Sequence, residues 1–262
     1  MQSDLKLAIS AARAAGEVIM SYYEDEYDIK EKGGDERGGN PVTTADLEAD
    51  NILKRLLLEN RPDYGWLSEE TADSGERLKC DRVWIVDPID GTKEFIKGIP
   101  QFAISIGLAD QGEIILAVIL NPAKDEMYAA VRDEGITLNG KPVGVTEQSA
   151  LKGASVLASR SEVARGEFDD FKDEFEITPI GSIAYKLAMV ASGQADLTFT
   201  LTPKNEWDFA AGYLLVGEAG GHVQVLGGHP QRFNQEDPLV QGVVATNTAL
   251  FEPLMARLSD KV

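Results

Sequence analysis

The residues most suited to chemistry are two aspartates, Asp87 and Asp90, which follow an apolar run over residues 83–86 that predicts a buried strand. Pro88 stands between them and has no N–H to donate, so we expect the strand to end there. Two carboxylates that leave a strand side by side repel each other unless a cation lies between them, and oxygen ligands suit Mg²⁺. The same pattern is equally typical of an Asp-rich turn.

Three more acids stand at the ends of predicted elements, where an active site can be built. Glu69 follows a short predicted strand, Asp46 lies in the first turn of a predicted helix, and Asp208 starts another helix. The structural alternatives are ordinary ones, because Asp46 stabilises a helix dipole there and Asp208 is a natural N-cap. The acids therefore indicate either separate structural roles or one shared cation site.

Composition limits the classes of function. Among 262 residues there are 44 acids and 25 bases, for a formal net charge of −19, which argues against binding to nucleic acid polymers or to anionic membranes. The single Cys80 excludes an intramolecular disulfide, and two histidines leave no room for a His-rich zinc site. The longest apolar run, residues 114–120, is too short to span a bilayer, and the N-terminus shows no secretion signal, so we expect a cytoplasmic protein.

The elements that must position these acids fall into two halves. In residues 1–140, two amphipathic helices precede alternating apolar segments at 102–108 and 114–120, which predict an antiparallel sheet with the helices packed on it. In residues 141–262, strands alternate with helices, which is typical of an α/β half that contributes Asp208 and substrate contacts. We expect Thr44 to cap the second helix. The glycine-rich segment 30–41 is either a solvated linker or a lid over the site.

Three segments together resemble the motifs of the inositol monophosphatase superfamily, with a fourth match at residues 42–46; they are Glu69-Glu70, Asp87-Pro88-Ile89-Asp90-Gly91-Thr92 and Trp207-Asp208 followed by Ala210-Ala211-Gly212. The resemblance extends from the first predicted helix to the last. Members of this superfamily are Mg²⁺-dependent, lithium-sensitive phosphomonoesterases. The resemblance implies a mixed α+β and α/β chain with a layered αβαβα sugar-phosphatase fold, and a small phosphorylated substrate bound between the halves.

The resemblance also implies roles for individual residues. Two or three Mg²⁺ would be held by Glu69, Asp87, the carbonyl of Ile89, Asp90 and Asp208. The catalytic set would be Asp46, Thr92 and Glu69, with Asp46 and Thr92 orienting and deprotonating the attacking water. Substrate would be bound by Asp90, Gly91, Thr92, Lys186 and Asp208. Bound cations would offset the negative charge that otherwise repels a phosphate dianion.

Residues after the Gly-Thr step indicate the substrate. Lys93-Glu94-Phe95 resembles the bacterial 3′(2′),5′-bisphosphate nucleotidases, and so does Lys186, which is either an exposed helix lysine or the partner of a second phosphate. We therefore expect hydrolysis of 3′-phosphoadenosine 5′-phosphate to AMP and phosphate, which would clear a by-product of sulfate assimilation. Thr200 and Leu201 match neither the nucleotidases nor the inositol phosphatases, although Lys204 is available to replace a missing arginine.

Other functions remain open at this point. An inositol-1-phosphate or other sugar-phosphate phosphatase is the main alternative. A silent phosphate sensor has no need for the water-activating pair. An acidic scaffold or interaction protein would leave Glu69, Asp87, Asp90 and Asp208 unexplained. We expect a monomer or a homodimer.

Overall fold

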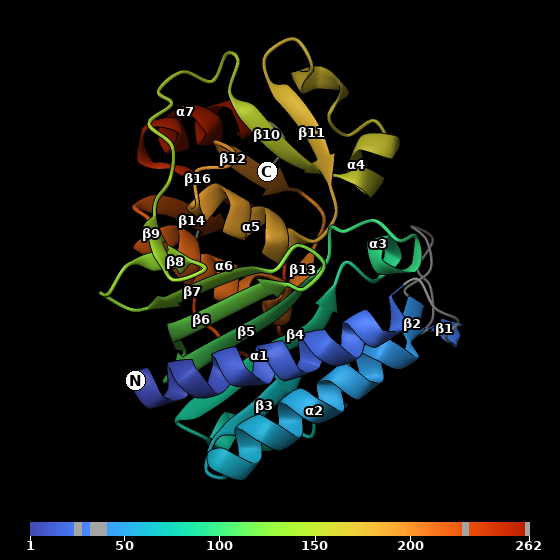
Figure 1. Ribbon diagram of the computed structural model, residues 1–262. Helices are drawn as coiled ribbons and strands as arrows, with labels where there is room; N and C mark the ends of the chain where they lie inside the picture. The colour runs from blue at the N-terminus through green and yellow to red at the C-terminus, as the bar shows by residue number, and fades with distance from the viewer. Residues whose placement is uncertain (24–27, 32–40, 227–230, 260–262) are drawn as a thin grey trace.

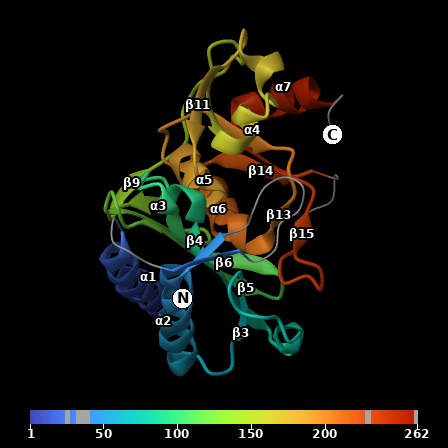
Figure 2. The ribbon, with the colours of Figure 1, turned by 90° about the vertical axis from the view of Figure 1, so that its right-hand side faces the viewer.

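The computed structural model describes residues 1–23, 28–31, 41–226 and 231–259. Its elements form alternating layers of helices and sheets (Figure 1): α1 and α2, a seven-stranded sheet, α5 and α6, a five-stranded sheet, and α7 on the outer side. The view from the side shows the same sequence of layers, with α1 and α2 at one end and α7 at the other (Figure 2). The predicted layered αβαβα arrangement of a mixed α+β chain is therefore confirmed.

The first layer consists of α1 (Gln2–Tyr22) and α2 (Thr44–Asn60). Small buried residues such as Ala8, Ala12 and Ala15 let α1 lie close to α2 and to the sheet. The expected cap Thr44 is wrong, because Thr43 is the N-cap of α2 and Asp46 accepts from the Thr43 N–H at 2.7 Å in a capping box. This places Asp46 at the third helical position, on the buried face of α2.

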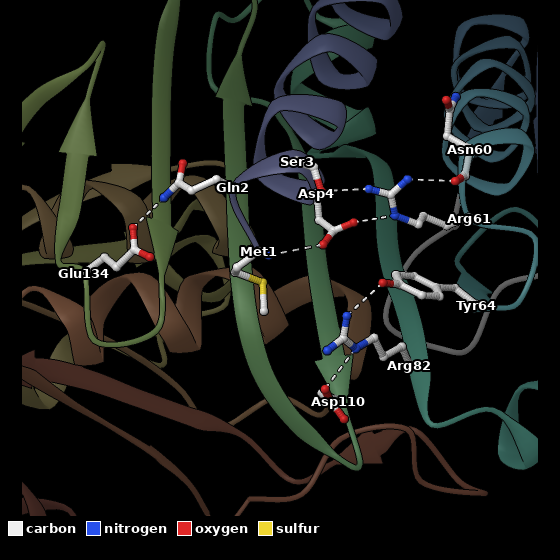
Figure 3. Close-up of polar contacts among 10 residues, drawn as sticks. All are labelled: Met1, Gln2, Ser3, Asp4, Asn60, Arg61, Tyr64, Arg82, Asp110 and Glu134. Carbon is white, nitrogen blue, oxygen red and sulfur yellow. Dashed lines mark hydrogen bonds and ion pairs between the residues drawn. The ribbon is translucent and has the colours of Figure 1, made fainter.

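One buried acid joins the start of α1 to the end of α2 (Figure 3). The Asp4 carboxylate is 3% exposed and accepts from Arg61 Nε at 2.6 Å, while Arg61 also donates to Ser3 Oγ at 3.0 Å. Nearby, Arg82 donates to the hydroxyl of Tyr64 and to Asp110 at 2.9 Å each. These contacts stabilise the end of α2 that is opposite to Asp46.

The seven-stranded sheet has the order β3-β4-β5-β6-β7-β8-β9. Its strands are β3 (Gly65–Ser68), β4 (Arg82–Asp90), β5 (Ala103–Asp110), β6 (Glu113–Asn121), β7 (Glu126–Val131), β8 (Ile136–Leu138) and β9 (Lys141–Val143). The predicted antiparallel pairing is confirmed from β4 onward, whereas β3 is parallel to β4. Both faces of the central strands are buried by helices, so these strands are nearly continuous apolar runs.

The strand β4 does not end at Pro88, contrary to expectation. It continues to Asp90, and its register with β5 shifts between Asp87 and Asp90. A bulge of this kind accommodates a residue that cannot donate to the ladder, and it turns the following side chains away from the regular alternation. The irregularity therefore falls within the acidic motif itself.

The five-stranded sheet has the order β11-β10-β12-β16-β14. Its strands are β10 (Ser155–Ser159), β11 (Glu176–Ile180), β12 (Leu197–Thr200), β14 (Gly221–Val225) and β16 (Val243–Asn247). Between the two sheets lie α5 (Ile183–Ala191) and α6 (Glu206–Glu218), and α7 (Thr248–Leu258) covers the outer face. Gly212 permits the close contact of α6 with α5, because a Cβ there would lie 2.4 Å from the Leu187 side chain.

The remaining elements are short. They are the helices α3 (Thr92–Ile96) and α4 (Arg160–Ala164), the 3₁₀ turns at Glu76–Lys79 and Asp169–Phe171, and the two-stranded pairs β1 (Ile29–Glu31) with β2 (Pro41–Thr43) and β13 (Lys204–Asn205) with β15 (Leu239–Val240). Residues 32–40, the main part of the segment expected to be a linker or a lid, lie outside the described residues. Within the described part of the chain, no helix combines the length and the apolar character that a membrane crossing requires.

Candidate active site

The turn after β4 builds one wall of the site. The side chain of Asp87 accepts from the backbone N–H of Ile89 at 3.0 Å, which fixes the carboxylate within the bulge. Gly91 then begins α3 with a φ of 100°, and a Cβ at this position would lie 2.9 Å from the carbonyl oxygen of Gln101. Glycine is therefore required here both by the backbone conformation and by the close approach of the neighbouring chain.

Three of the predicted acids come together although they are far apart in sequence. Glu69, Asp87 and Asp208 each offer an oxygen within 4.8 Å of the others. The parallel pairing of β3 and β4 explains the first two, since Ser68 is opposite Val86 and the Glu69 N–H donates to the Val86 carbonyl at 3.3 Å. Carboxylates grouped in this way provide the hard oxygen ligands that Mg²⁺ and similar divalent cations prefer.

The third acid of the cluster has a structural role as well. Asn205 is the N-cap of α6, so the expectation that Asp208 could be the N-cap is wrong. Asp208 occupies the third helical position, and its carboxylate accepts from the Asn205 N–H at 2.9 Å in a capping box. This bond orients the side chain from the first turn of α6 toward Glu69 and Asp87.

The fourth predicted acid, Asp90, lines the same cavity and is held by the start of α5. Its Oδ2 accepts from Ser182 Oγ and from the Ala184 N–H, each at 2.6 Å, at the start of α5. Ser182 is the N-cap of this helix. Asp90 lines the cavity together with Asp87 and Ile89, but it is not part of the three-residue cluster.

Burial and mutual repulsion make the acids poor carriers of negative charge unless a cation binds. Burial raises the pKa of Asp87 well above its ordinary value, and the charges of Glu69, Asp90 and Asp208 raise it further. Burial, followed by the charge of Asp90, raises the pKa of Asp208 to about 7. A divalent cation among these oxygens would restore their ionised forms. The donor set therefore fits a metal ion of this kind.

A threonine–aspartate pair adjoins the acid cluster. The Thr92 hydroxyl has two acceptors within hydrogen-bond distance of its Oγ1, Asp46 Oδ1 at 3.0 Å and the Ile89 carbonyl oxygen at 3.1 Å. The other carboxylate oxygen of Asp46 accepts from the Thr43 hydroxyl at 2.5 Å and from the Thr43 N–H. Asp46 is 1% exposed, and both of its carboxylate oxygens accept hydrogen bonds from groups inside the protein.

One cavity of about 290 Å³ adjoins these residues, and its lining combines both charges. The lining includes the acids Glu69, Asp87, Asp90, Glu94 and Asp208, the lysines Lys93, Lys186 and Lys204, and the serines Ser159, Ser161 and Ser182. The interpretation of Lys186 as an exposed helix lysine is wrong, because this residue is 3% exposed. Burial lowers the pKa of Lys186 to about 8, and the charge of Glu162 is the largest influence in the opposite direction.

Sequence reasoning missed the residues that hold the segment around Glu69, one of the three clustered acids. Asp50 is 5% exposed and accepts from the hydroxyl groups of Ser68 and Thr71, which flank the Glu69-Glu70 pair. The available signal was spacing, since Asp46 and Asp50 are four residues apart and therefore on one face of α2. An acid on an otherwise apolar helical face indicates a buried polar partner.

The sequence and the fold both match those of known proteins. A family model described as the inositol monophosphatase family matches residues 1–262. An inositol-1-monophosphatase of Mesorhizobium japonicum is 36% identical over 265 residues, which cover 97% of this chain and 92% of that protein.

Two solved structures extend the comparison. The IMPase of Thermotoga maritima aligns with a TM-score of 0.87 at 27% identity, over 99% of this chain and 98% of that one. CysQ of Bacteroides thetaiotaomicron, described as a bacterial member of the same family, aligns with a TM-score of 0.75 at 32% identity, over 94% of this chain and 98% of that one. The chain therefore belongs to the inositol monophosphatase family, and it is a metal-dependent phosphomonoesterase.

Proposed function

We propose that this phosphomonoesterase uses Mg²⁺ to hydrolyse a 3′(2′),5′-bisphosphate nucleotide, converting 3′-phosphoadenosine 5′-phosphate to AMP and phosphate. The observation that carries the proposal is the burial of Lys186 in the same cavity as the acid cluster. The charge of Glu162 offsets part of the cost of burying this ammonium group, and an anion bound in the cavity would offset more of it. A substrate with two phosphates would supply one anion for the metal ions and a second for Lys186 and Lys204, which line the same cavity.

In this proposal the metal ions would be held by Glu69, Asp87, the Ile89 carbonyl, Asp90 and Asp208. Bound ions of this kind neutralise the phosphoryl oxygens and lower the pKa of a coordinated water. The number of ions, two or three, follows the family pattern. Lithium sensitivity is expected from the same pattern.

The chain's own residues would bind the phosphate and remove the proton of the attacking water. The Thr92 hydroxyl donates to Asp46 and Thr92 lines the cavity, so an Oγ1 lone pair would be available to a water bound there. A water proton can pass to Thr92 Oγ1 as the Thr92 proton passes to Asp46 Oδ1, so that the pair acts as the general base. The N–H groups of Gly91 and Thr92, two residues that line the cavity, would donate to the phosphoryl oxygens.

A second candidate substrate is inositol 1-phosphate. It is favoured by the Mesorhizobium japonicum relative, which is named an inositol-1-monophosphatase and matches 97% of this chain. The CysQ structure is 32% identical to this chain, which is less than the 36% identity of the Mesorhizobium japonicum relative. A polar cavity with lysine and serine side chains accommodates either a second phosphate or a ring of hydroxyl groups, although burial of Lys186 favours the phosphate.

The test is phosphate release from a panel of substrates at a fixed Mg²⁺ concentration. We expect kcat/KM for 3′-phosphoadenosine 5′-phosphate to exceed that for inositol 1-phosphate and for fructose 1,6-bisphosphate. Chelation of divalent ions should abolish all release, and added Mg²⁺ should restore it. A higher kcat/KM for inositol 1-phosphate would overturn the nucleotide assignment, while release that persists after chelation would overturn the metal assignment.

A further inference from the structure

The buried carboxylate of Asp50 uses both of its oxygens to hold the segment that follows β3. Its Oδ1 accepts from Ser68 Oγ at 2.5 Å, and its Oδ2 accepts from Thr71 Oγ1 at 2.7 Å. Thr71 Oγ1 also accepts from the indole N–H of Trp66 at 3.2 Å. The position of the Thr71 hydroxyl is therefore fixed from two directions.

The two hydroxyl-bearing residues, Ser68 and Thr71, flank Glu69 and Glu70 in the sequence. Ser68 is the last residue of β3, and its Oγ lies 3.4 Å from the Glu70 N–H that donates to it. On the other side, the Glu69 N–H donates to the Val86 carbonyl of β4. The Glu69 backbone is thus held between the strand β4 and the helix α2.

We propose that Asp50 is a positioning residue, which holds Ser68 and Thr71 and so fixes the direction in which Glu69 presents its carboxylate to Asp87 and Asp208. The inference rests on the proposed metal-binding role of Glu69. In this proposal α2 positions two parts of the site. Asp50 holds the segment around Glu69, and Asp46, on the same face of the helix, accepts a hydrogen bond from Thr92.

The chemistry of Asp50 favours this role over one in packing. A buried carboxylate loses its hydration, and a well-packed apolar residue at such a position is often as stabilising or more so. The neighbouring positions on this face are apolar, among them Ala49 and Leu53. An ionised carboxylate accepts hydrogen bonds at both oxygens, whereas an amide accepts at only one. Two donors that must be fixed at once therefore require an acid here.

The decisive measurement is the affinity for Mn²⁺ alone, obtained by electron paramagnetic resonance of free Mn²⁺ without substrate or turnover. Loss of an outer partner of a metal ligand typically weakens metal binding by roughly 10–100-fold. We expect Asp50→Ala to weaken Mn²⁺ binding within that range, and Asp50→Asn, which keeps one acceptor, to weaken it less. Thr71→Val removes one of the two donors and keeps its shape, so we expect a smaller loss of the same kind.

Asp4→Ala is the matched control. Asp4 is also a buried acid of the first helical layer, at 3% exposure, and it holds Arg61 at the opposite end of α2 (Figure 3). We expect this variant to lower the melting temperature without changing Mn²⁺ affinity. If Asp50→Ala folds poorly, Thr71→Val carries the test alone, because Thr71 is only partly buried and the substitution keeps its shape.

Glu69→Gln separates the failure of this inference from that of the proposed function. If Glu69→Gln weakens Mn²⁺ binding while Asp50→Ala and Thr71→Val leave it at the wild-type value, Asp50 is structural and the inference is overturned. If Glu69→Gln itself leaves the affinity unchanged, the metal-binding role of Glu69 is overturned, and the inference with it. A loss in all three variants, together with less than additive effects in Asp50→Ala/Thr71→Val, supports the inference.

Discussion

Thr92 donates a hydrogen bond to Asp46 at 3.0 Å, although the two residues are 46 positions apart in the sequence. Asp46 cannot turn away from Thr92, because its second oxygen is occupied by the N–H and the hydroxyl of Thr43. The capping box at the start of α2 therefore does more than stabilise the helix: it also holds the acceptor for the Thr92 proton. A hydroxyl whose own proton is committed in this way presents a lone pair to a water in the cavity.

Replacement of Thr92 by alanine should lower kcat with little change in KM. The variant removes the hydroxyl that passes a proton to Asp46, and loss of a general base typically costs about 10²–10⁴-fold in rate. Steady-state kinetics with the preferred substrate of the panel measures both constants. Thr92→Ser is the matched control, since it keeps the hydroxyl, and it should retain most of the activity. An unchanged kcat in Thr92→Ala would contradict the assigned role.

Replacement of Gly91 by alanine should disturb the turn that carries Thr92. The backbone at Gly91 has a φ of 100°, and the added Cβ would lie 2.9 Å from the Gln101 carbonyl. Strain of this kind costs about 1–3 kcal/mol of folding free energy. We expect a lower melting temperature together with a lower kcat. Gly98→Ala, at a φ of 64° but in open space, is the control, and its activity should remain near normal.

The sequence was sufficient for the elements whose pattern is local. The helices α1, α2 and α7 and the strands β5 to β7 follow directly from apolar periodicity. The parallel pairing of β3 with β4 was not foreseen, because it depends on which strands become neighbours and not on either strand alone. Continuation of β4 past Pro88 was missed for a similar reason, since a bulge next to β5 accommodates the proline.

The site shows the same division between local and long-range information. The motifs singled out Glu69, Asp87 and Asp208, which lie together, but spacing could not show that Asp90 is also held at the start of α5, where Ser182 donates to it. Burial of Lys186 was equally hidden, because α5 lies between two sheets and is covered on several sides. The division of the chain near residue 140 stays a prediction.

Replacement of Asp87 by asparagine should abolish turnover and yet stabilise the protein in the absence of metal. The Asp87 carboxylate is buried among other acids, which raises its pKa, so its ionised form destabilises the metal-free fold. The variant removes this charge and keeps the shape. Calorimetry in a chelating buffer near pH 8 should show a higher melting temperature than the wild type. Normal phosphate release by Asp87→Asn would contradict the proposed ligand role.

The stability of the metal-free protein should fall as the pH rises toward 7. Burial and the charge of Asp90 raise the pKa of Asp208 from 3.8 to about 7 in the folded state, so the folded protein binds a proton that the unfolded chain has already lost. The Asp208 carboxyl group therefore adds its full contribution to the folding stability below about pH 4, and this contribution is lost as the pH rises through about 7. Melting temperatures of the wild type and of Asp208→Asn should converge at low pH and separate at high pH. Saturating Mg²⁺ should remove the difference between the two variants in how melting temperature depends on pH. Parallel pH profiles of the two variants without metal would contradict the raised pKa of Asp208.

Replacement of Lys186 by methionine should impair bisphosphate substrates more than monophosphates. Methionine fills a similar volume in the buried position and removes only the charge that would face the second phosphate. A charged hydrogen bond is worth about 1.5–3 kcal/mol, so we expect KM for 3′-phosphoadenosine 5′-phosphate to rise roughly 10–100-fold. KM for inositol 1-phosphate should change much less, because this substrate carries no second phosphate. Lys172→Met is the control, since Lys172 is 62% exposed and pairs with Asp169 away from the cavity. Equal losses on both substrate types in Lys186→Met would mean that the lysine binds the reacting phosphate itself, and the nucleotide assignment would lose its main support.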